Sequence, residues 1–461
     1  MKKTSLLLIS FIKDDCRTIG TTSLYANMKA KGIETKLLYI NIDTSLDVEK
    51  FGVFLRGEQF GYIGISLMSQ DYHFAVKLSK IIRKIAPNAF LLWGGIHPTC
   101  LPEESLDNDI DCIFIGEAEN SLYDLISARN DNNDISAIKG IGIKKNERYI
   151  LNSPNFVKDI DTLHFPYYDF GNFFLLDDTD VKIRNFTLDD YKRYSKHGGD
   201  GYTLMTSRSC PHSCSYCINS FMNKLYSSER KGKITMRRRS VKNTIEEIKY
   251  ALENIPTVEF INFMDDHFLV GKEWLEEFYD AYPAKIGLPF IIRSTTEAIS
   301  EYHIKRLSEC GLQVVQMGIQ SASERTHREI FNRRFSKESV LNAASLLSQY
   351  NIKGMYDFII GNEFETDEEK ESTIRLMMEL PKPYEASVFH IVPFPKTDII
   401  GFYKKITLRH ALIHMIQIIL ILQRTTFLQI WRILFHCMTM TKLSIICNIN
   451  RTAVFVKKYT Y

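Results

Sequence analysis

The chain has 461 residues, of which 45% are hydrophobic and 25% are charged, and its formal net charge is +3. This length predicts two or three domains, and the composition is that of an ordinary globular protein with enough apolar residues for a core. A net charge so close to zero argues against nucleic acid as a partner, because such binding usually needs a strongly basic surface.

The chain begins with a short apolar run that stops at Lys13-Asp14-Asp15, with no small-residue cleavage site nearby. We therefore expect the first strand of a buried parallel sheet rather than a signal peptide. Nine cysteines, three of them within eight residues, indicate a reducing cytoplasm with one metal site rather than a disulfide framework. The other six are expected to be small buried apolar residues: Cys16, Cys100, Cys112, Cys310, Cys437 and Cys447.

Residues 1–150 alternate short apolar runs with helical patterns, which predicts a Rossmann-like, doubly wound parallel sheet covered by helices. The five expected strands are Leu6–Phe11, Thr35–Ile40, Tyr62–Ser66, Phe90–Trp93 and Ile110–Ile115. A helix is expected from about Tyr72 to Ile85, before Pro87. The last two strands run directly into Gly94-Gly95 and Gly116, where glycine forms a tight turn or lets a ligand approach the backbone at the carboxyl edge.

Residues 151–200 lose this periodicity and are rich in Asp, Asn, Tyr and Pro, so we expect a linker and packing segment. Alternation resumes over residues 201–398, where six strand–helix units predict a partial (β/α)6 barrel of the TIM type, with its chemistry at the carboxyl ends of the strands. The expected strands are Tyr202–Ser207, Val258–Met264, Leu288–Ile292, Gln313–Ile319, Gly354–Ile360 and Ser387–Val392.

Three cysteines, Cys210, Cys214 and Cys217, follow the first of these strands with spacings of three and two residues. Such spacing lets three thiolates converge on one centre from a single loop. A structural zinc ion needs four ligands, and His212 would strain the loop as the fourth, although zinc stays an alternative. An iron–sulfur cubane usually takes four cysteines, so three leave one iron open to a substrate or cofactor, as a catalyst requires.

The Cys-x3-Cys-x2-Cys pattern, with the aromatic Tyr216 before its last cysteine, resembles the radical S-adenosylmethionine (SAM) superfamily. The resemblance implies a 4Fe–4S cluster on the three cysteines, an open iron that binds SAM, and Tyr216 near this cofactor. One electron cleaves SAM to methionine and a 5′-deoxyadenosyl radical, which abstracts hydrogen from a small-molecule substrate. We therefore predict no side chain as the catalytic group, and an electron donor such as flavodoxin or ferredoxin as a partner.

Other segments resemble the subgroup that has an N-terminal cobalamin-type domain. Ser207-Arg208-Ser209-Cys210-Pro211 matches its Ser-Arg-Gly-Cys-Pro, although serine replaces glycine at 209 and predicts strain if this position needs a positive φ. The later matches are Asp265–Phe268, Met317–Glu324 and Asp357–Thr366, the last with Asn362-Glu363-Phe364 in place of Leu-Pro-Gly. By this resemblance Asp265, Arg293 and Gln320 lie near SAM; each alone could also be a strand-end cap or a surface polar group.

The N-terminal domain is similar to the cobalamin-binding domain of that subgroup. The matching segments are Gly64-Ile65-Ser66-Leu67, Gly94–Thr99 and Gly116–Glu119. The resemblance implies that Ser66, Gly94, Gly95 and Gly116 line the pocket for the nucleotide tail of cobalamin. The Asp-x-His-x-x-Gly motif with a cobalt-ligating histidine is absent, and Asp15-Cys16-Arg17 stands near its usual place; His97 is expected to cap or pack.

Residues 399–461 contain no acidic residue, although 55 precede them, and they contain nine Lys and Arg. This shift favours a frameshifted or recombined end; a membrane-surface helix around Ala411–Leu422 and a buried helical tail are the alternatives. We predict no transmembrane helix, because Gln423, Thr425 and Thr426 interrupt the apolar run. The basic stretch 230–239 is expected to be a solvated loop, with contact to an anionic substrate as the alternative.

The leading hypothesis is therefore a cytoplasmic, cobalamin-dependent radical SAM enzyme that modifies, and most often methylates, an unactivated carbon of a small molecule. Oxidative cyclisation or rearrangement by the same chemistry is one alternative. A non-catalytic or decayed iron–sulfur protein is another, suggested by Ser209, the altered turn at 362–364 and the tail.

Overall fold

The computed structural model describes residues 5–13, 15–16, 18–43, 46–166, 168–177, 183–194, 200–228 and 236–403. Its contacts divide the chain into two compact units. The first consists of Met1–Pro211 and Met222–Ile292, and the second of His212–Phe221 and Arg293–Tyr461.

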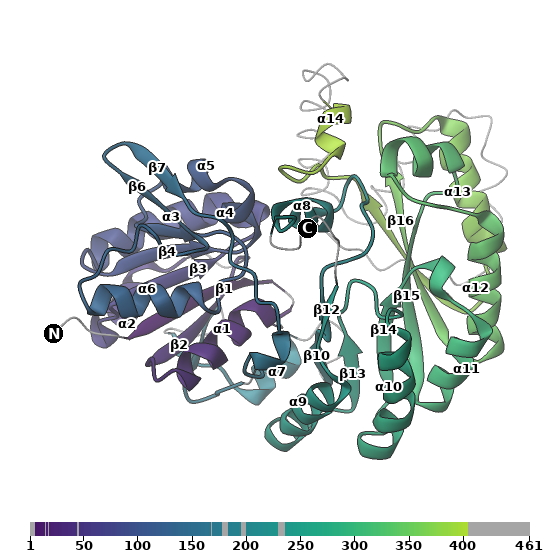
Figure 1. Cartoon of the computed structure of the whole chain (residues 1–461), viewed down its shortest axis with the longest axis horizontal. Coiled ribbons are helices and arrows are strands. Elements are labelled where there is room, and N and C mark those ends of the chain that lie inside the picture. The colour runs from purple at the N-terminus through teal and green to yellow at the C-terminus, as the bar shows by residue number, and fades with distance from the viewer. Residues whose placement is uncertain are drawn as a thin grey trace. The chain divides into compact units, whose positions relative to one another are not determined.

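A nine-stranded sheet forms the centre of the first unit, in the order β7-β6-β5-β4-β3-β1-β2-β8-β9 (Figure 1). Its strands are β1 (Leu6–Ile12), β2 (Thr35–Asn41), β3 (Tyr62–Ser66), β4 (Phe90–Gly94), β5 (Cys112–Phe114), β6 (Ile141–Lys145), β7 (Arg148–Leu151), β8 (Phe173–Leu176) and β9 (Arg184–Asn185). The central strands β5-β4-β3-β1-β2 are all parallel, as their continuous apolar runs predict.

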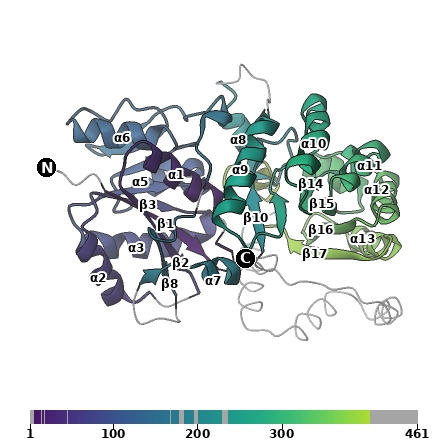
Figure 2. The same ribbon diagram turned by 90° about the horizontal axis from the view of Figure 1, so that it is seen from below.

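Helices cover both faces of this sheet, which confirms the predicted doubly wound fold. They are α1 (Ile19–Ala30), α2 (Val48–Glu58), α3 (Tyr72–Ile85), α4 (Ile96–Cys100), α5 (Pro102–Leu106) and α6 (Ser121–Asn130), with a 3-10 turn η1 (Ser69–Asp71). Helices α2 and α3 bury Phe51, Leu55, Leu78 and Ile82 against the strands, and α1 and α6 lie on the opposite face (Figure 2). Helix α3 ends at Ile85, where the sequence predicts it to end.

The segment 151–200, expected as a linker, instead extends the first sheet in its described parts. Strand β8 pairs in parallel with β2, and β9 pairs in antiparallel with β8. The segment also contains a 3-10 turn η2 (Ile160–Thr162) and a helix α7 (Leu188–Arg193). Its strands are only four and two residues long, which is too short for a clear alternation in the sequence. The boundary at residue 150 stays a prediction.

The six strands expected after residue 200 are all present. The strands β10 (Gly201–Leu204), β13 (Phe260–Phe263) and β14 (Phe290–Ser294) pair in parallel in that order; they belong to the first unit except for Arg293 and Ser294 at the end of β14. In the second unit, β15 (Leu312–Gln320), β16 (Lys353–Gly361) and β17 (Tyr384–His390) do the same. The helices that follow these strands are α9 (Val241–Asn254), α10 (Lys272–Lys285), α11 (Glu301–Glu309), α12 (Lys337–Gln349) and α13 (Asp367–Glu379). Helices α11, α12 and α13 cover one face of the second unit's strands (Figure 1).

Shorter elements lie along the chain among these strands and helices. They are β11 (Ser207–Arg208), α8 (Ile218–Leu225), β12 (Arg237–Arg238), the 3-10 turn η3 (Thr296–Ala298), a π-helical turn η4 (Thr326–Phe331) and α14 (Ile399–Tyr403). Strand β10 ends three residues before the expected Ser207, because Ser207 and Arg208 pair in antiparallel with Arg238 and Arg237.

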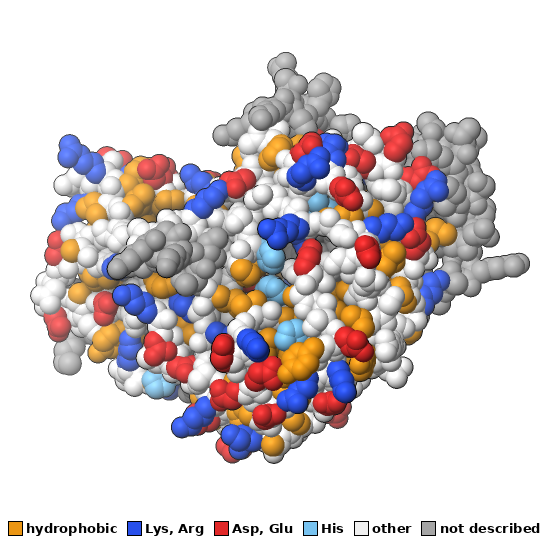
Figure 3. All heavy atoms as spheres, turned by 45° about the vertical axis from the view of Figure 1, so that its right-hand side comes forward, with side chains coloured by type: hydrophobic (Ala, Val, Ile, Leu, Met, Phe, Trp, Pro, Cys, Tyr) orange, Lys and Arg blue, Asp and Glu red, His pale blue; other side chains and the backbone are white. Residues whose placement is uncertain are grey.

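Acidic and basic side chains are interspersed over the face shown in Figure 3, in keeping with the net charge of +3. Among the helices of the residues described above, none is long and apolar enough to cross a membrane. Residues 404–461, which include the helix considered at Ala411–Leu422, lie outside the described residues, as do residues 229–235 of the basic stretch.

Ser209 adopts a left-handed backbone conformation with a φ of 83°. The backbone strain that we predicted for a serine with a positive φ at this position is therefore present. For an L-residue this region costs roughly 1–2 kcal/mol, a cost that glycine does not have. We expect Ser209→Gly to raise the free energy of unfolding by about 1 kcal/mol, read as a higher thermal midpoint of the apo protein. Ser213→Gly is the matched control, because Ser213 is exposed and does not have a positive φ. This substitution should lower the thermal midpoint. A lower midpoint for Ser209→Gly would contradict the strain.

Candidate functional site

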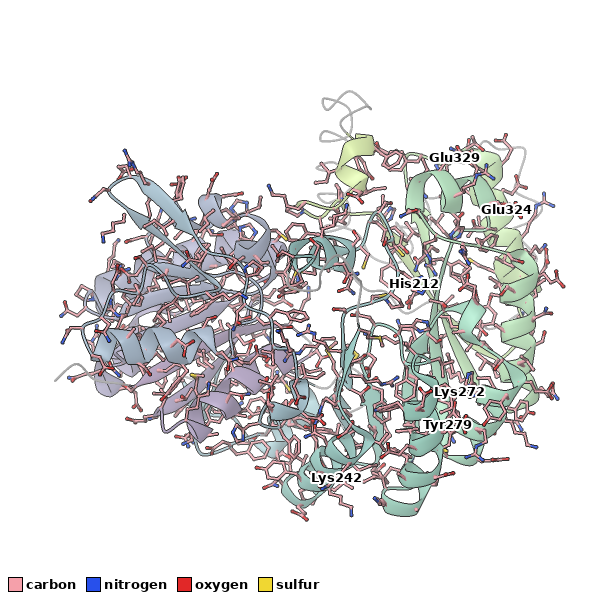
Figure 4. The ribbon with its side chains drawn as sticks, viewed as in Figure 1. His212, Lys242, Lys272, Tyr279, Glu324 and Glu329 are labelled. Atoms are coloured by element: carbon pink, nitrogen blue, oxygen red, sulfur yellow. The ribbon has the colours of Figure 1, made fainter. Side chains whose placement is uncertain are left out.

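The three cysteines of the Cys-x3-Cys-x2-Cys loop are half-buried. Cys210 follows β11, and its carbonyl oxygen accepts a hydrogen bond from Nδ2 of Asn223 at 2.8 Å. The backbone N–H of Cys217 donates to the carbonyl oxygen of Cys214 at 3.1 Å. His212 is exposed on the loop between them (Figure 4). Three partly accessible thiols on one loop fit the soft ligand set of an iron–sulfur cluster. Within the described chain no three metal-ligating side chains are already gathered, so this ligand set stays a prediction.

Asp265 anchors the chain just before this loop. Its carboxylate is fully buried and accepts hydrogen bonds from the backbone N–H of Thr206 at 3.1 Å, from Oγ1 of Thr206 at 2.8 Å and from Oγ of Ser207. These donors compensate the loss of hydration of the buried charge. Asp265 therefore positions the loop through its neighbours, and its predicted contact with SAM stays a prediction.

Residues at the end of η4 and just after it hold the second half of the loop. Oγ and the backbone N–H of Ser215 donate to the carbonyl oxygens of Ile330 and Phe331, respectively. The guanidinium of Arg333 donates to the hydroxyl of Tyr216 at 3.0 Å, and the ring of Tyr216 packs edge-on against Phe331. Burial raises the pKa of the Cys214 thiol, and the positive charge of Arg333 opposes this rise. Arg333 was not predicted, because nothing in its local sequence marks it.

Gln320 ends β15 in a left-handed conformation with a φ of 69°. A Cβ atom at Gly318 would collide with Nε2 of Gln320 and lie 3.5 Å from a guanidinium nitrogen of Arg333. Glycine at 318 thus lets both side chains lie over the end of the strand. The structure brings Gln320, Arg333 and Tyr216 to the same end of the second unit, beside the cysteine loop.

Arg293 belongs to a polar chain across three strands. Its Nε donates to Oε1 of Gln316 at 3.0 Å, and Nε2 of Gln316 donates to Oδ2 of Asp357 at 2.8 Å. These residues are half-buried on β14, β15 and β16, whereas their strand neighbours Met317 and Phe358 are buried. Burial raises the pKa of Asp357 to about 6, although Gln316 and Arg293 favour its ionised form. Oδ1 of Asp357 has no hydrogen-bond partner among the described atoms.

The residues expected to bind cobalamin meet at the carboxyl edge of the first sheet. Ser66 pairs with Gly94 in the ladder of β3 and β4, and Gly95 follows with a φ of 99°. Oγ1 of Thr99 donates to the carbonyl oxygen of Gly95 at 2.8 Å and accepts from the backbone N–H of Gly116 at 3.1 Å. The glycines after two strands are therefore one connected turn system, which could cradle a ligand close to the backbone.

His97 is buried beside this turn. Its Nδ1 lies 3.2 Å from Oγ of Ser69, its ring packs on Tyr72 at 4.5 Å, and burial lowers its pKa. This environment fits the expected packing role.

The basic residues 237–239 do not form the solvated loop that the sequence suggested. Arg237 and Arg239 are buried and pair with Glu117 and Glu247, respectively. Arg238 stacks on the ring of Trp274 at 3.4 Å. Each guanidinium has a partner on another element or turn of the fold, which a run of basic residues in the sequence does not reveal.

The raised pKa of Asp357 generates a stability test. Above the folded-state pKa of about 6, the folded protein bears the cost of an ionised buried carboxylate, and this cost declines as the pH falls toward the unfolded-state pKa. We expect Asp357→Asn to raise the thermal midpoint at pH 7.5 and to raise it less at pH 5.5. Asp131→Asn, at an exposed site, is the control. A constant difference between variant and wild type at all pH values would contradict the shift.

Comparison with known proteins places two domains in the chain. A family model of the B12 binding domain matches residues 6–126, and that of the radical SAM superfamily matches residues 204–377. An uncharacterized methyltransferase, PH0819 of Pyrococcus horikoshii, is 26% identical over 339 residues, 73% of this chain and 67% of the relative. An anaerobic magnesium-protoporphyrin IX monomethyl ester cyclase of Synechocystis is 28% identical over 304 residues, 64% of this chain and 55% of the relative.

Solved structures show the same fold. The radical SAM methyltransferase TsrM of Kitasatospora setae superposes with a TM-score of 0.68 at 15% identity, over 87% of this chain and 76% of that chain. The cobalamin-dependent radical enzyme OxsB gives a TM-score of 0.64 at 16% identity, over 83% of this chain and 53% of that chain. The chain thus carries a B12 binding domain followed by a domain that matches the radical SAM superfamily.

Proposed function

We propose that this protein is a cobalamin-dependent radical SAM enzyme that methylates an unactivated carbon of a small molecule. The observation that carries the proposal is the order of its two domains, a B12 binding domain at 6–126 and a radical SAM domain at 204–377 that contains the three-cysteine loop. The named methyltransferase of Pyrococcus horikoshii, which this chain matches over 67% of that protein's length, supports methylation.

Cys210, Cys214 and Cys217 would hold the 4Fe–4S cluster, which supplies one electron for the cleavage of SAM. Arg293 is a cation suited to the carboxylate of SAM, and the amide of Gln320 can exchange hydrogen bonds with its polar groups. Tyr216, packed on Phe331 and hydrogen-bonded to Arg333, would lie near SAM. Ser66 and the turns at Gly94-Gly95 and Gly116 would receive the nucleotide tail of cobalamin.

The proposal includes a reducing cytoplasm and an electron donor such as flavodoxin or ferredoxin. Both follow from the need to keep the three thiols reduced and to supply an electron to the cluster.

A cyclase activity is the second candidate, favoured by the 28% identity to the named Synechocystis enzyme, of which this chain spans 55%. The product would separate the two: methylation adds one carbon from SAM to the substrate, whereas cyclisation adds none.

The first test is SAM cleavage. After anaerobic iron–sulfur reconstitution and reduction with dithionite, we expect the wild type to convert SAM to 5′-deoxyadenosine and Cys214→Ala to form none, because the cluster loses a ligand. Cys310→Ala, a cysteine buried outside the loop, should retain product formation. Nucleoside and methionine are measured by mass spectrometry. A fully loaded wild type without product would favour the decayed iron–sulfur protein, and a colourless protein with zinc would favour the zinc site.

The second test is cobalamin binding. A Cβ atom at Gly94 would lie 3.8 Å from Phe114, an ordinary contact, so Gly94→Ala should fold normally while it obstructs a ligand on the backbone. We expect it to weaken aquacobalamin binding at least about tenfold, measured by absorbance titration, with an unchanged thermal midpoint. Gly57→Ala, on α2 with no atom within 4 Å of its Cβ position, is the control. Equal affinity of Gly94→Ala and wild type would place cobalamin elsewhere.

A further inference from the structure

Four charged side chains form an ion-pair network between the turn after β5 and the two-stranded antiparallel sheet of β11 and β12 in the first unit. Glu117 and Glu119 come from the turn, Arg208 from β11 and Arg237 from β12. Arg237 donates to both carboxylate oxygens of Glu117, at 2.9 and 2.7 Å. Arg208 donates to Oε1 of Glu119 at 2.6 Å and lies 3.3 Å from Oε1 of Glu117.

Two members of the network are buried and the other two, Glu117 and Arg208, are half-buried, so its members depend on one another. Glu119 and Arg237 are 5% and 9% exposed. Burial opposes the charged forms of Glu117 and Arg208, yet Arg237 and Arg208 hold the pKa of Glu117 below its usual range, and Glu119 and Glu117 raise the pKa of Arg208. Removing one partner would leave a buried charge uncompensated, so each residue restricts where the others can lie.

Both ends of the network lead to a proposed cofactor site. At one end, Glu117 follows Gly116, whose N–H is bonded through Thr99 to the Gly95 turn. At the other end, Arg208 stands two residues before Cys210, with the strained Ser209 between them. A continuous path of short contacts therefore runs from the turn proposed for cobalamin to the first cysteine of the loop.

We propose that Glu119 and Arg208 are positioning residues through which the B12 binding domain helps to retain the iron–sulfur cluster. Their ion pair fixes β11 relative to the turn after β5 and thereby sets the place of the Cys210 thiol. This proposal rests on the proposed function for the identity of both cofactors. The two residues act through Cys210 and take no part in a chemical step.

The test is the rate at which the reconstituted protein loses iron to a chelator, measured without SAM or cobalamin. We expect Glu119→Gln and Arg208→Gln each to raise this rate by about tenfold or more, as loss of a supporting contact does at other metal sites. The double variant should lose iron no faster than Arg208→Gln alone, because that substitution already removes the Arg208–Glu119 ion pair.

The control removes an exposed ion pair of similar length, Lys337–Glu379 at 2.7 Å, and should leave the rate unchanged. Thermal midpoints are measured in parallel, and iron loss that merely follows a fall in the midpoint of every variant would overturn the proposal. Unchanged iron loss in both single variants, or additive losses in the double variant, would overturn it as well.

Aquacobalamin supplies a second measurement that a purely structural ion pair would not affect. It should slow iron loss from the wild type and have little effect on Glu119→Gln. Equal protection of the two proteins would overturn the proposed coupling. A wild type that binds no cobalamin would instead contradict the cobalamin part of the proposed function, and the iron-loss rates without cobalamin would still decide the role of the ion pair.

Discussion

The cysteine loop depends on the buried carboxylate of Asp265. It receives the backbone N–H and hydroxyl of Thr206 and the hydroxyl of Ser207, so the chain leaves the sheet directly after β10. A buried carboxylate with these donors is stabilised in one arrangement and would be costly in most others. Asp265 thereby fixes the direction of the chain a few residues before Cys210, while Asn223 fixes the carbonyl of Cys210 itself.

The left-handed residue Ser209 lies between these fixed points. Strain at a single residue persists only where the surrounding structure determines the backbone on both sides, and Arg208 and Cys210 are each bound to a different element. The strained conformation of Ser209 therefore indicates that contacts on both sides hold the backbone of the loop in place. A loop that must present a thiolate to a metal has reason to be rigid, because ligand geometry sets affinity.

Much of the fold follows from the sequence, because its periodic signals are strong. The strands β1 to β5 are apolar runs, and the ends of helix α3 coincide with the predicted ones. The short strands β8 and β9 escaped prediction because they have too few residues to show a period.

The cysteines and glycines of the candidate site were visible as motifs, but its supporting residues were not. Arg333, Gln316 and Arg237 act through partners on other elements. Such partners depend on the register of the strands and on which face each side chain occupies. The spacing of residues along the chain reveals neither the register nor the face. For this reason the basic residues 237–239 were predicted to be exposed, although Arg237 and Arg239 are buried.

The polar chain across β14, β15 and β16 shows how such pairing limits chemistry. Arginine only donates hydrogen bonds and an ionised carboxylate only accepts them, so the amide of Gln316 must turn its oxygen to Arg293 and its nitrogen to Asp357. The carboxylate of Asp357 thus fixes the orientation of the Gln316 amide, and this amide in turn orients the guanidinium of Arg293. If Arg293 binds the carboxylate of SAM, as proposed, this link restricts how its guanidinium turns, and the affinity for SAM then depends on a carboxylate two strands away.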